Sequence, residues 1–262
     1  MYAWRLPEGS LSYVKNESVR KENVACRATC IRFNPGILTT EREEENMKNN
    51  TAEIVFILDN SGSMGGLESD TIGGYNSFLN RQKKEGGTAL VSTVLFNNES
   101  TVLHDRVSIE TVQPMTEKDY TAGGCTALLD ALGGAIRHIK MVHRYIRKED
   151  IPDKTIFVIT TDGMENASRR FSYRDVKQLV EEQKKAGWEF LFLGANIDAV
   201  AAAAQYGISE DRAVRFHSDK KGTALNYEVI SETVSSMRAG DLPIGRSWKK
   251  RITEDYESRS KE

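Results

Sequence analysis

The stretch that decides the fold is IVFILDNSGS, residues 54–63. Its first five residues form a continuous apolar run, which indicates a strand covered by other elements on both faces. The run is followed by one carboxylate and two hydroxyls at alternate positions, Asp59, Ser61 and Ser63. Hard oxygen donors of this kind select Mg²⁺, Mn²⁺ or Ca²⁺. The stretch therefore predicts a divalent-metal site at the end of a buried strand.

Strand-like and helix-like segments alternate through the rest of the chain, which predicts an α/β fold with a mainly parallel, doubly wound sheet and helices on both faces. The turn Asn97-Asn98 predicts a hairpin and hence one antiparallel edge strand. Ser172 and Asp175 form a capping-box pattern at the start of a helix. The expected strands are residues 53–58, 89–96, 101–107, 154–161, 188–193 and 213–217, and the expected helices are residues 72–82, 128–146, 176–180, 197–205 and 225–237.

Two further loops carry oxygen donors next to expected strands or helices. Thr126 precedes the helix of residues 128–146, and Asp162 follows the strand of residues 154–161. Ligands of open α/β sheets bind at the carboxyl ends of strands, where the winding direction reverses. If the strands that end at Asp59 and Asp162 are neighbours there, five oxygen donors meet at one ion. The candidate metal ligands are Asp59, Ser61, Ser63, Thr126 and Asp162. For Thr126 alone, a simple helix N-cap is the alternative.

The charge balance of this site indicates what it could bind. We expect Mg²⁺ in first place, with Mn²⁺ or Ca²⁺ as alternatives, and some of the five groups acting through water. Two acidic residues, Asp59 and Asp162, neutralise a dication incompletely, so the metal can attract another carboxylate. The site therefore predicts the capture of an Asp or Glu from a protein partner.

Residues 54–64, 123–128 and 158–163, taken together, resemble the metal-ion-dependent adhesion site (MIDAS) motifs of von Willebrand factor type A (VWA) domains. The resemblance covers residues 51–237 and places the domain at 47–240. It implies a six-stranded Rossmann-like sheet with a metal at its top, and it assigns the metal-site roles to the five residues named above. It also implies a metal-dependent protein-binding module that is not an enzyme. Within this family the chain looks like a bacterial or phage-related intracellular member.

Two other functions compete with this interpretation. The first is a Mg²⁺-dependent hydrolase or phosphotransferase with Asp59 as phosphoryl acceptor. Glu165 is the one candidate base near the site, the four histidines lie outside the three loops, and the sequence has no P-loop motif. The second is a metal-independent scaffold, which would bind the same partners with and without chelator.

Bulk composition argues against nucleic acid and membranes as partners. The formal net charge is −2, and no apolar run reaches the ~18 residues that span a bilayer. A basic cluster on the helix of residues 128–146 is expected to be a solvated face rather than a nucleic-acid site. Three cysteines and no signal-like start predict a cytoplasmic protein. The cluster comprises Arg137, His138, Lys140, His143, Arg144, Arg147 and Lys148.

The two ends of the chain differ from its centre. Residues 1–46 show no sustained hydrophobic periodicity of 2 or 3.6 residues, and they end in EREEEN before Met47. Glu and Asn codons, and two of the Arg codons, are purine-rich. A purine-rich run just before a methionine codon is typical of a bacterial ribosome-binding site that has been translated in frame. Residues 1–46 are therefore either a mis-annotated extension, with Met47 as the start, or a disordered arm. Residues 241–262 are expected to form a polar C-terminal tail.

Overall fold

Six strands form one sheet in the order β3-β2-β1-β4-β5-β6. The computed structural model describes residues 51–240 and 244–260. Only β3 runs antiparallel, paired to β2 in the expected hairpin at the sheet edge. The predicted mainly parallel sheet with one antiparallel edge strand is confirmed. The strands are β1 (Thr51–Asp59), β2 (Thr88–Phe96), β3 (Ser100–Ser108), β4 (Lys154–Thr161), β5 (Glu189–Ala195) and β6 (Ala213–Phe216).

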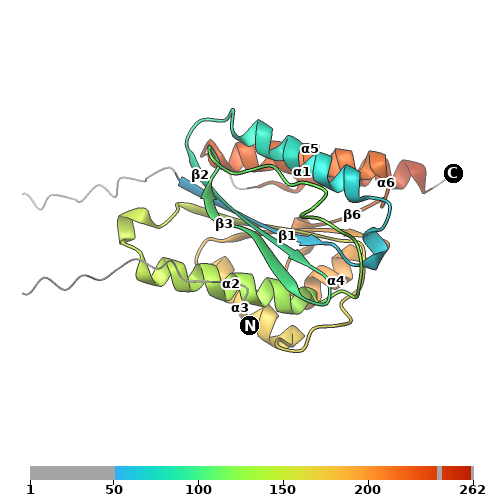
Figure 1. Ribbon diagram of the computed structural model, residues 1–262, viewed down its shortest axis with the longest axis horizontal. Helices are drawn as coiled ribbons and strands as arrows, with labels where there is room; N and C mark the ends of the chain where they lie inside the picture. The colour runs from blue at the N-terminus through green and yellow to red at the C-terminus, as the bar shows by residue number, and fades with distance from the viewer. Residues whose placement is uncertain (1–50, 241–243, 261–262) are drawn as a thin grey trace, which may run out of the picture. The chain divides into compact units, whose positions relative to one another are not determined.

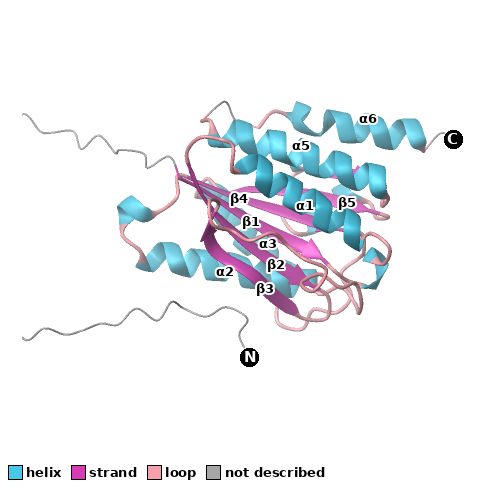
Figure 2. Ribbon diagram, turned by 45° about the horizontal axis from the view of Figure 1, so that its top comes forward, coloured by secondary structure: helices cyan, strands magenta, loops and turns pink. Residues whose placement is uncertain are grey.

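Helices cover both faces of this sheet. Figure 1 and Figure 2 show α1, α5 and α6 on one side and α2, α3 and α4 on the other. None of the helices among residues 51–240 and 244–260 is both long and apolar enough to cross a membrane. The predicted capping box at Ser172 and Asp175 is present at the start of α3. The helices are α1 (Glu68–Gln82), α2 (Leu128–Tyr145), α3 (Tyr173–Lys185), α4 (Ala199–Gln205), α5 (Lys220–Arg238) and α6 (Lys250–Arg259).

The two-sided cover explains the continuous apolar run of β1. Ile54 and Phe56 belong to the core beneath α1 and α5, whereas Val55 and Ile57 belong to the core beneath α2 and α3. All four side chains are fully buried. Because successive side chains of a strand point to opposite faces, a strand that is buried on both faces needs apolar residues at every position.

The winding direction of the sheet reverses between β1 and β4. From β1 the chain goes outward to β2 and β3, and it then returns to β4 on the other side of β1. The two central strands are parallel, with Leu58 opposite Thr160. Asp59 and Thr161 therefore follow side by side at the carboxyl edge. This is the neighbour relation that the predicted metal site requires.

The C-terminal segment differs from the expected polar tail. Its described part forms a short 3-10 turn, η4 (Arg246–Lys249), followed by α6. Ile252 is 1% exposed and joins the core, and the indole Nε1 of Trp248 donates to the carbonyl of Asp211 (2.8 Å). One buried isoleucine in an otherwise polar stretch gives too weak a periodic signal to predict a packed helix. The two interpretations of residues 1–46 lie outside the described residues.

The basic cluster of α2 also differs in part from the expected solvated face. The imidazole of His138 is buried, with Nε2 3.0 Å from Asp105 Oδ1. His143 Nε2 is hydrogen-bonded to Glu53 Oε2 (2.6 Å), and Lys140 pairs with Glu182 (2.9 Å). Several of these cations are therefore committed to partners within the chain.

Candidate metal centre

Asp59 ends β1 and is held from several directions, although it is only 2% exposed. Its Oδ1 accepts the backbone N–H of Ser61 (2.7 Å), and its Oδ2 accepts the hydroxyl of Thr161 (2.6 Å). Its backbone carbonyl accepts the hydroxyl of Tyr120. The carboxylate is thus oriented by Ser61 of the loop after β1 and by Thr161 of β4, and the backbone of Asp59 is held by Tyr120 of the loop before α2.

The two serines link Asp59 to Asp162. Ser61 Oγ lies 3.1 Å from Ser63 Oγ, and the Ser63 hydroxyl donates to Asp162 Oδ1. The other oxygen of this carboxylate, Oδ2, is buried and accepts no hydrogen bond from the described residues. An unpaired buried carboxylate oxygen is costly in a folded protein. It is therefore a free ligand position.

Thr126 reaches the same space from the loop before α2. A Cβ placed on Gly163 would lie 3.0 Å from Thr126 Oγ1 and 3.4 Å from Ser63 Oγ. Gly163 therefore faces both hydroxyls, and its lack of a side chain leaves room between them. The structure brings together all five predicted site residues, Asp59, Ser61, Ser63, Thr126 and Asp162.

The N-cap alternative for Thr126 is wrong. The N-cap residue of α2 is Ala127, which makes no side-chain cap. Glu165 caps this helix instead, because its Oε2 accepts the N–H of Leu129 (2.9 Å). Its Oε1 accepts the N–H groups of Ala167 (3.0 Å) and Ser168 (2.8 Å). Glu165 is thus engaged in a structural role, which leaves it poorly placed to act as the base of a hydrolase.

Backbone hydrogen bonds tie the three loops to one another. The N–H of Gly62 donates to the carbonyl of Gly124 (3.0 Å), and the N–H of Gly123 donates to that of Asn60 (2.9 Å). Gly124 has φ +82, and a Cβ there would lie 2.4 Å from Asn98 Oδ1. A left-handed φ and this close approach both require glycine. The loops are therefore held as one rigid cradle.

The electrostatics of the cradle favour an added cation. Burial raises the pKa of Asp59 above its usual range, against the hydrogen bonds from Thr161 and Ser61. Burial also raises the pKa of Asp162, and the negative charge of Asp59 raises it further. No Lys, Arg or His of residues 51–240 or 244–260 is among the main causes of either shift. Two buried carboxylates thus stand together without a cation from the chain.

The donor set fits a hard divalent ion that keeps part of its water shell. No group of three or more His, Cys, Asp or Glu able to hold a metal occurs among the described residues. A metal here would rely on two carboxylates and three hydroxyls, all of them hard oxygens. The unpaired Oδ2 of Asp162 supplies a ligand position, and the absence of a side chain at Gly163 keeps the hydroxyls of Thr126 and Ser63 uncovered.

Sequence reasoning missed several residues that support this site. Thr161 holds the carboxylate of Asp59, and the Asn166 side chain fixes Thr126 by accepting its N–H (2.9 Å). Ser218, after β6, adds a hydroxyl that lowers the pKa of Asp162. Thr161 lies in the motif of residues 158–163 that carries Asp162, and Asn166 lies three residues after it, so their proximity could have been a signal. Ser218 comes from a distant strand, and nothing in its local sequence marks it.

Three of the four histidines are engaged in contacts away from the cradle. His104 lies near Tyr75 and Thr93, and His138 pairs with Asp105. His143 pairs with Glu53 at the opposite end of β1. The fourth, His217, stacks on Tyr256 with ring centroids 4.5 Å apart. None of them supplies a free acid or base to the cradle.

The comparisons with known proteins rest on structure. No family model matches the sequence, and no curated protein matches it. The pilus adhesin SpaC from Lactobacillus rhamnosus GG, in its open conformation, is 11% identical with a TM-score of 0.54, over 71% of this chain and 30% of SpaC. The vWF domain of the type V pili tip protein Mfa5 from Porphyromonas gingivalis is 13% identical with a TM-score of 0.51, over 74% of this chain and 97% of that domain.

A third similar structure is proximal thread matrix protein 1 from the mussel byssus, with a zinc-occupied MIDAS motif. It is 18% identical with a TM-score of 0.49, over 71% of this chain and 46% of that protein. The chain thus spans less than half the length of this protein and of SpaC. The fold of the chain is that of a von Willebrand factor type A domain, as the motifs predicted.

Proposed function

We propose that this protein is a metal-dependent protein-binding module. Asp59, Ser61, Ser63, Thr126 and Asp162 would hold one divalent ion, with Mg²⁺ as the expected metal. The observation that carries the proposal is the buried Asp162 Oδ2, which has no hydrogen-bond partner among the described residues, whereas the other oxygen of this carboxylate accepts the hydroxyl of Ser63. A bound dication would supply the partner that this oxygen lacks.

The charge of the cradle supports capture of an acidic residue. Carboxylates that contact a dication partly through water would neutralise it incompletely, and one of the two, Asp162, already accepts a hydrogen bond from Ser63. The metal would therefore keep an exchangeable position that faces solvent. A partner Asp or Glu is the anionic oxygen ligand best suited to this position. The bound ion supplies attraction and orientation, and the loops supply a rigid frame.

A catalytic role has no comparable support. The candidate base Glu165 caps α2, and the described histidines are engaged elsewhere. Phosphoryl transfer would also need a cation beside the transferred group, and no basic side chain of residues 51–240 or 244–260 acts on Asp59 or Asp162. We therefore propose binding without catalysis. Cytoplasmic location and the exclusion of nucleic acid and membrane stay predictions.

The test is affinity capture from a cell lysate with the full chain as bait, in Mg²⁺, in chelator, and with Asp59→Ala in Mg²⁺. Asp153→Ala is the matched control, because Asp153 is an exposed aspartate at the amino end of β4. We expect a partner that is retained by the wild-type protein and the control only in Mg²⁺. Identical partners in chelator and with Asp59→Ala would contradict the proposal and favour the metal-independent scaffold.

A further inference from the structure

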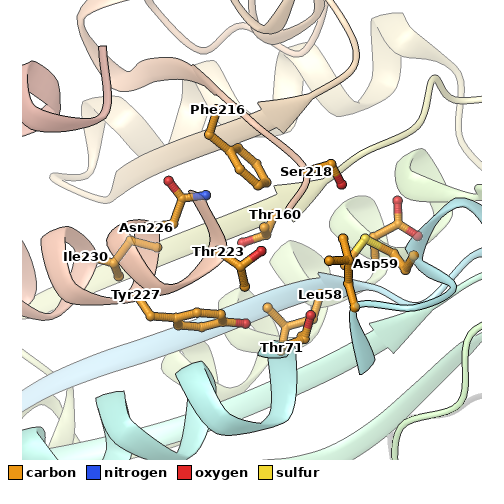
Figure 3. Close-up of a pocket in the computed structure, with 12 residues that line it drawn as sticks. Leu58, Asp59, Thr71, Thr160, Phe216, Ser218, Thr223, Asn226, Tyr227 and Ile230 are labelled. Carbon is orange, nitrogen blue, oxygen red and sulfur yellow. The ribbon is translucent and has the colours of Figure 1, made fainter. Parts of the chain in front are cut away.

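A small cavity with apolar walls and several polar side chains at its edge adjoins the metal cradle, on the α1 and α5 side of the sheet. Figure 3 shows Thr71 from α1, Thr160 from β4, and Asn226 and Tyr227 from α5 around it. Leu58, Phe216 and Ile230 provide apolar walls, and Asp59 and Ser218 also line the space. The cavity therefore shares its upper boundary with the candidate metal site.

The polar atoms of this cavity are buried but unpaired. Thr71 Oγ1, Thr160 Oγ1, the Tyr227 hydroxyl and both side-chain atoms of Asn226 have no hydrogen-bond partner among the described residues. Thr71, Asn226 and Tyr227 are 3%, 2% and 4% exposed. More than nine-tenths of buried polar groups in proteins are paired, if not with protein then with water. Five unpaired atoms around one small space thus point to a missing ligand.

The position of Tyr227 shows that the polar lining is built into the packing. A Cβ on Gly74 of α1 would lie 2.1 Å from Tyr227 Cδ2. A glycine at this position lets the ring lie directly against the backbone of α1. Figure 3 shows that the hydroxyl end of Tyr227 then points toward Thr71. The close packing of the Tyr227 ring on α1 thus places a buried hydroxyl at the cavity.

The size of the cavity decides between ligands. The space open to the centre of a water molecule is about 10 Å³, and one water needs about 10–15 Å³ by this measure. The lining offers hydroxyls and an amide, which can both donate and accept. Both Asp59 oxygens already accept hydrogen bonds from Ser61 and Thr161. A cation of the Mg²⁺ or Ca²⁺ kind would need at least six oxygen ligands here, and Asn226 Nδ2 is a donor.

We infer that this cavity is a binding site for one ordered water molecule that joins α5 to α1 and β4 beneath the metal cradle. The water accepts a hydrogen bond from a donor of α5 and donates to hydroxyl oxygens of α1 or β4. A buried water of this kind typically makes about three hydrogen bonds. It supplies the polar contacts that the side chains do not make with one another. The inference does not depend on metal binding.

The first test is a crystal structure of the full chain at a resolution that shows ordered waters. We expect one density peak within hydrogen-bond distance of at least two of the residues Thr71, Thr160, Asn226 and Tyr227. An empty cavity would overturn the inference. A peak with several oxygen neighbours at the short distances typical of a metal ion would also overturn it.

The second test compares two buried tyrosines in solution by thermal denaturation in chelator. The hydroxyl of Tyr75 is bonded to Thr93 Oγ1 (2.6 Å), so Tyr75→Phe is the control and should lower the midpoint. If water binds Tyr227, Tyr227→Phe should lower the midpoint as well, because the water loses a partner. If the cavity is dry, Tyr227→Phe removes an unpaired buried hydroxyl and should raise the midpoint or leave it unchanged. That result would overturn the inference.

Discussion

Two buried carboxylates on β1, Glu53 and Asp59, differ in whether a basic side chain lies beside them. Glu53 at the amino end of β1 is 0% exposed and Asp59 at the carboxyl end is 2% exposed. Glu53 lies 2.6 Å from Arg106 Nε and 2.6 Å from His143 Nε2. The carboxylate oxygens of Asp59 accept the backbone N–H of Ser61 and the hydroxyl of Thr161, both of which are uncharged groups.

The difference separates a structural charge from a binding site. A buried charge is costly unless a counter-charge and hydrogen bonds compensate it. At the amino end the chain provides a cation of its own, the guanidinium of Arg106 in β3, together with the ring of His143 in α2. At the carboxyl end it places a second buried carboxylate, Asp162, beside the first and provides no cation. The metal ion that we propose for that end would come from solution.

We expect the largest change in stability from removal of Arg106, the basic partner of Glu53 at the amino end of β1. Arg106→Met leaves Glu53 buried with less counter-charge, and we expect the free energy of unfolding to fall by about 3–5 kcal/mol. Urea denaturation measures this loss. The control is Arg81→Met, because Arg81 and its partner Glu232 are 45% and 43% exposed, 3.8 Å apart. This exposed pair should contribute less than about 1 kcal/mol. Equal losses for the two variants would show that the Glu53 pair is not a buried structural charge.

Added Mg²⁺ should stabilise the fold through the carboxylates at the carboxyl end of β1 and not through Glu53 at its amino end. At a Mg²⁺ concentration of 100 times the Kd, the free energy of unfolding should rise by about 2.7 kcal/mol. Asp59→Ala should lose this increase, whereas Arg106→Met should keep it if the variant remains folded. Urea denaturation with and without Mg²⁺ measures both. An increase that persists in Asp59→Ala would place the metal elsewhere.

The Mg²⁺ increase should also depend on pH. The pKa values of Asp59 and Asp162 are raised in the folded protein, so without metal these two groups destabilise the fold as pH rises through the raised values. Metal binds the deprotonated carboxylates. The increase should therefore be full at neutral pH and decline as pH falls through the raised pKa values. Denaturation at several pH values tests this, and an increase that is constant with pH would contradict it.

A smaller effect is expected from narrowing the cradle. Gly163→Ala adds a Cβ 3.0 Å from Thr126 Oγ1 and 3.4 Å from Ser63 Oγ. We expect Mg²⁺ affinity to fall by a factor of about ten, equivalent to ~1.4 kcal/mol, with little change in apo stability. Gly134→Ala is a matched control, because a Cβ there has nothing within 4 Å. Titration calorimetry measures both affinities, and equal affinities would show that Gly163 does not border the ion.

The central strands, and the proximity of the five candidate site residues, could be predicted because their signals are local. The apolar run of residues 54–58 and the donors that follow it occupy one short stretch. Alternating strands and helices then constrain where the strand ends meet. The capping box at Ser172 could also be predicted, because its two hydrogen bonds join residues three positions apart.

The features that the sequence did not reveal depend on distant contacts. Glu53 reads as a polar interruption of an apolar strand, and its partners Arg106 and His143 are 53 and 90 positions away. Ser218 reaches Asp162 only because β5 and β6 continue the sheet beyond β4. The α6 helix was missed because its only fully buried apolar side chain is Ile252.

The most direct test of the central claim is a crystal structure of the full chain grown with Mn²⁺, which gives an anomalous signal and shares the oxygen preference of Mg²⁺. We predict one strong peak at the carboxyl ends of β1 and β4, with Asp162 Oδ2 and the hydroxyls of Ser61 and Ser63 as its nearest protein oxygens. A structure with no peak there, or with Mn²⁺ bound only elsewhere, would contradict the claim that this cradle takes its cation from solution.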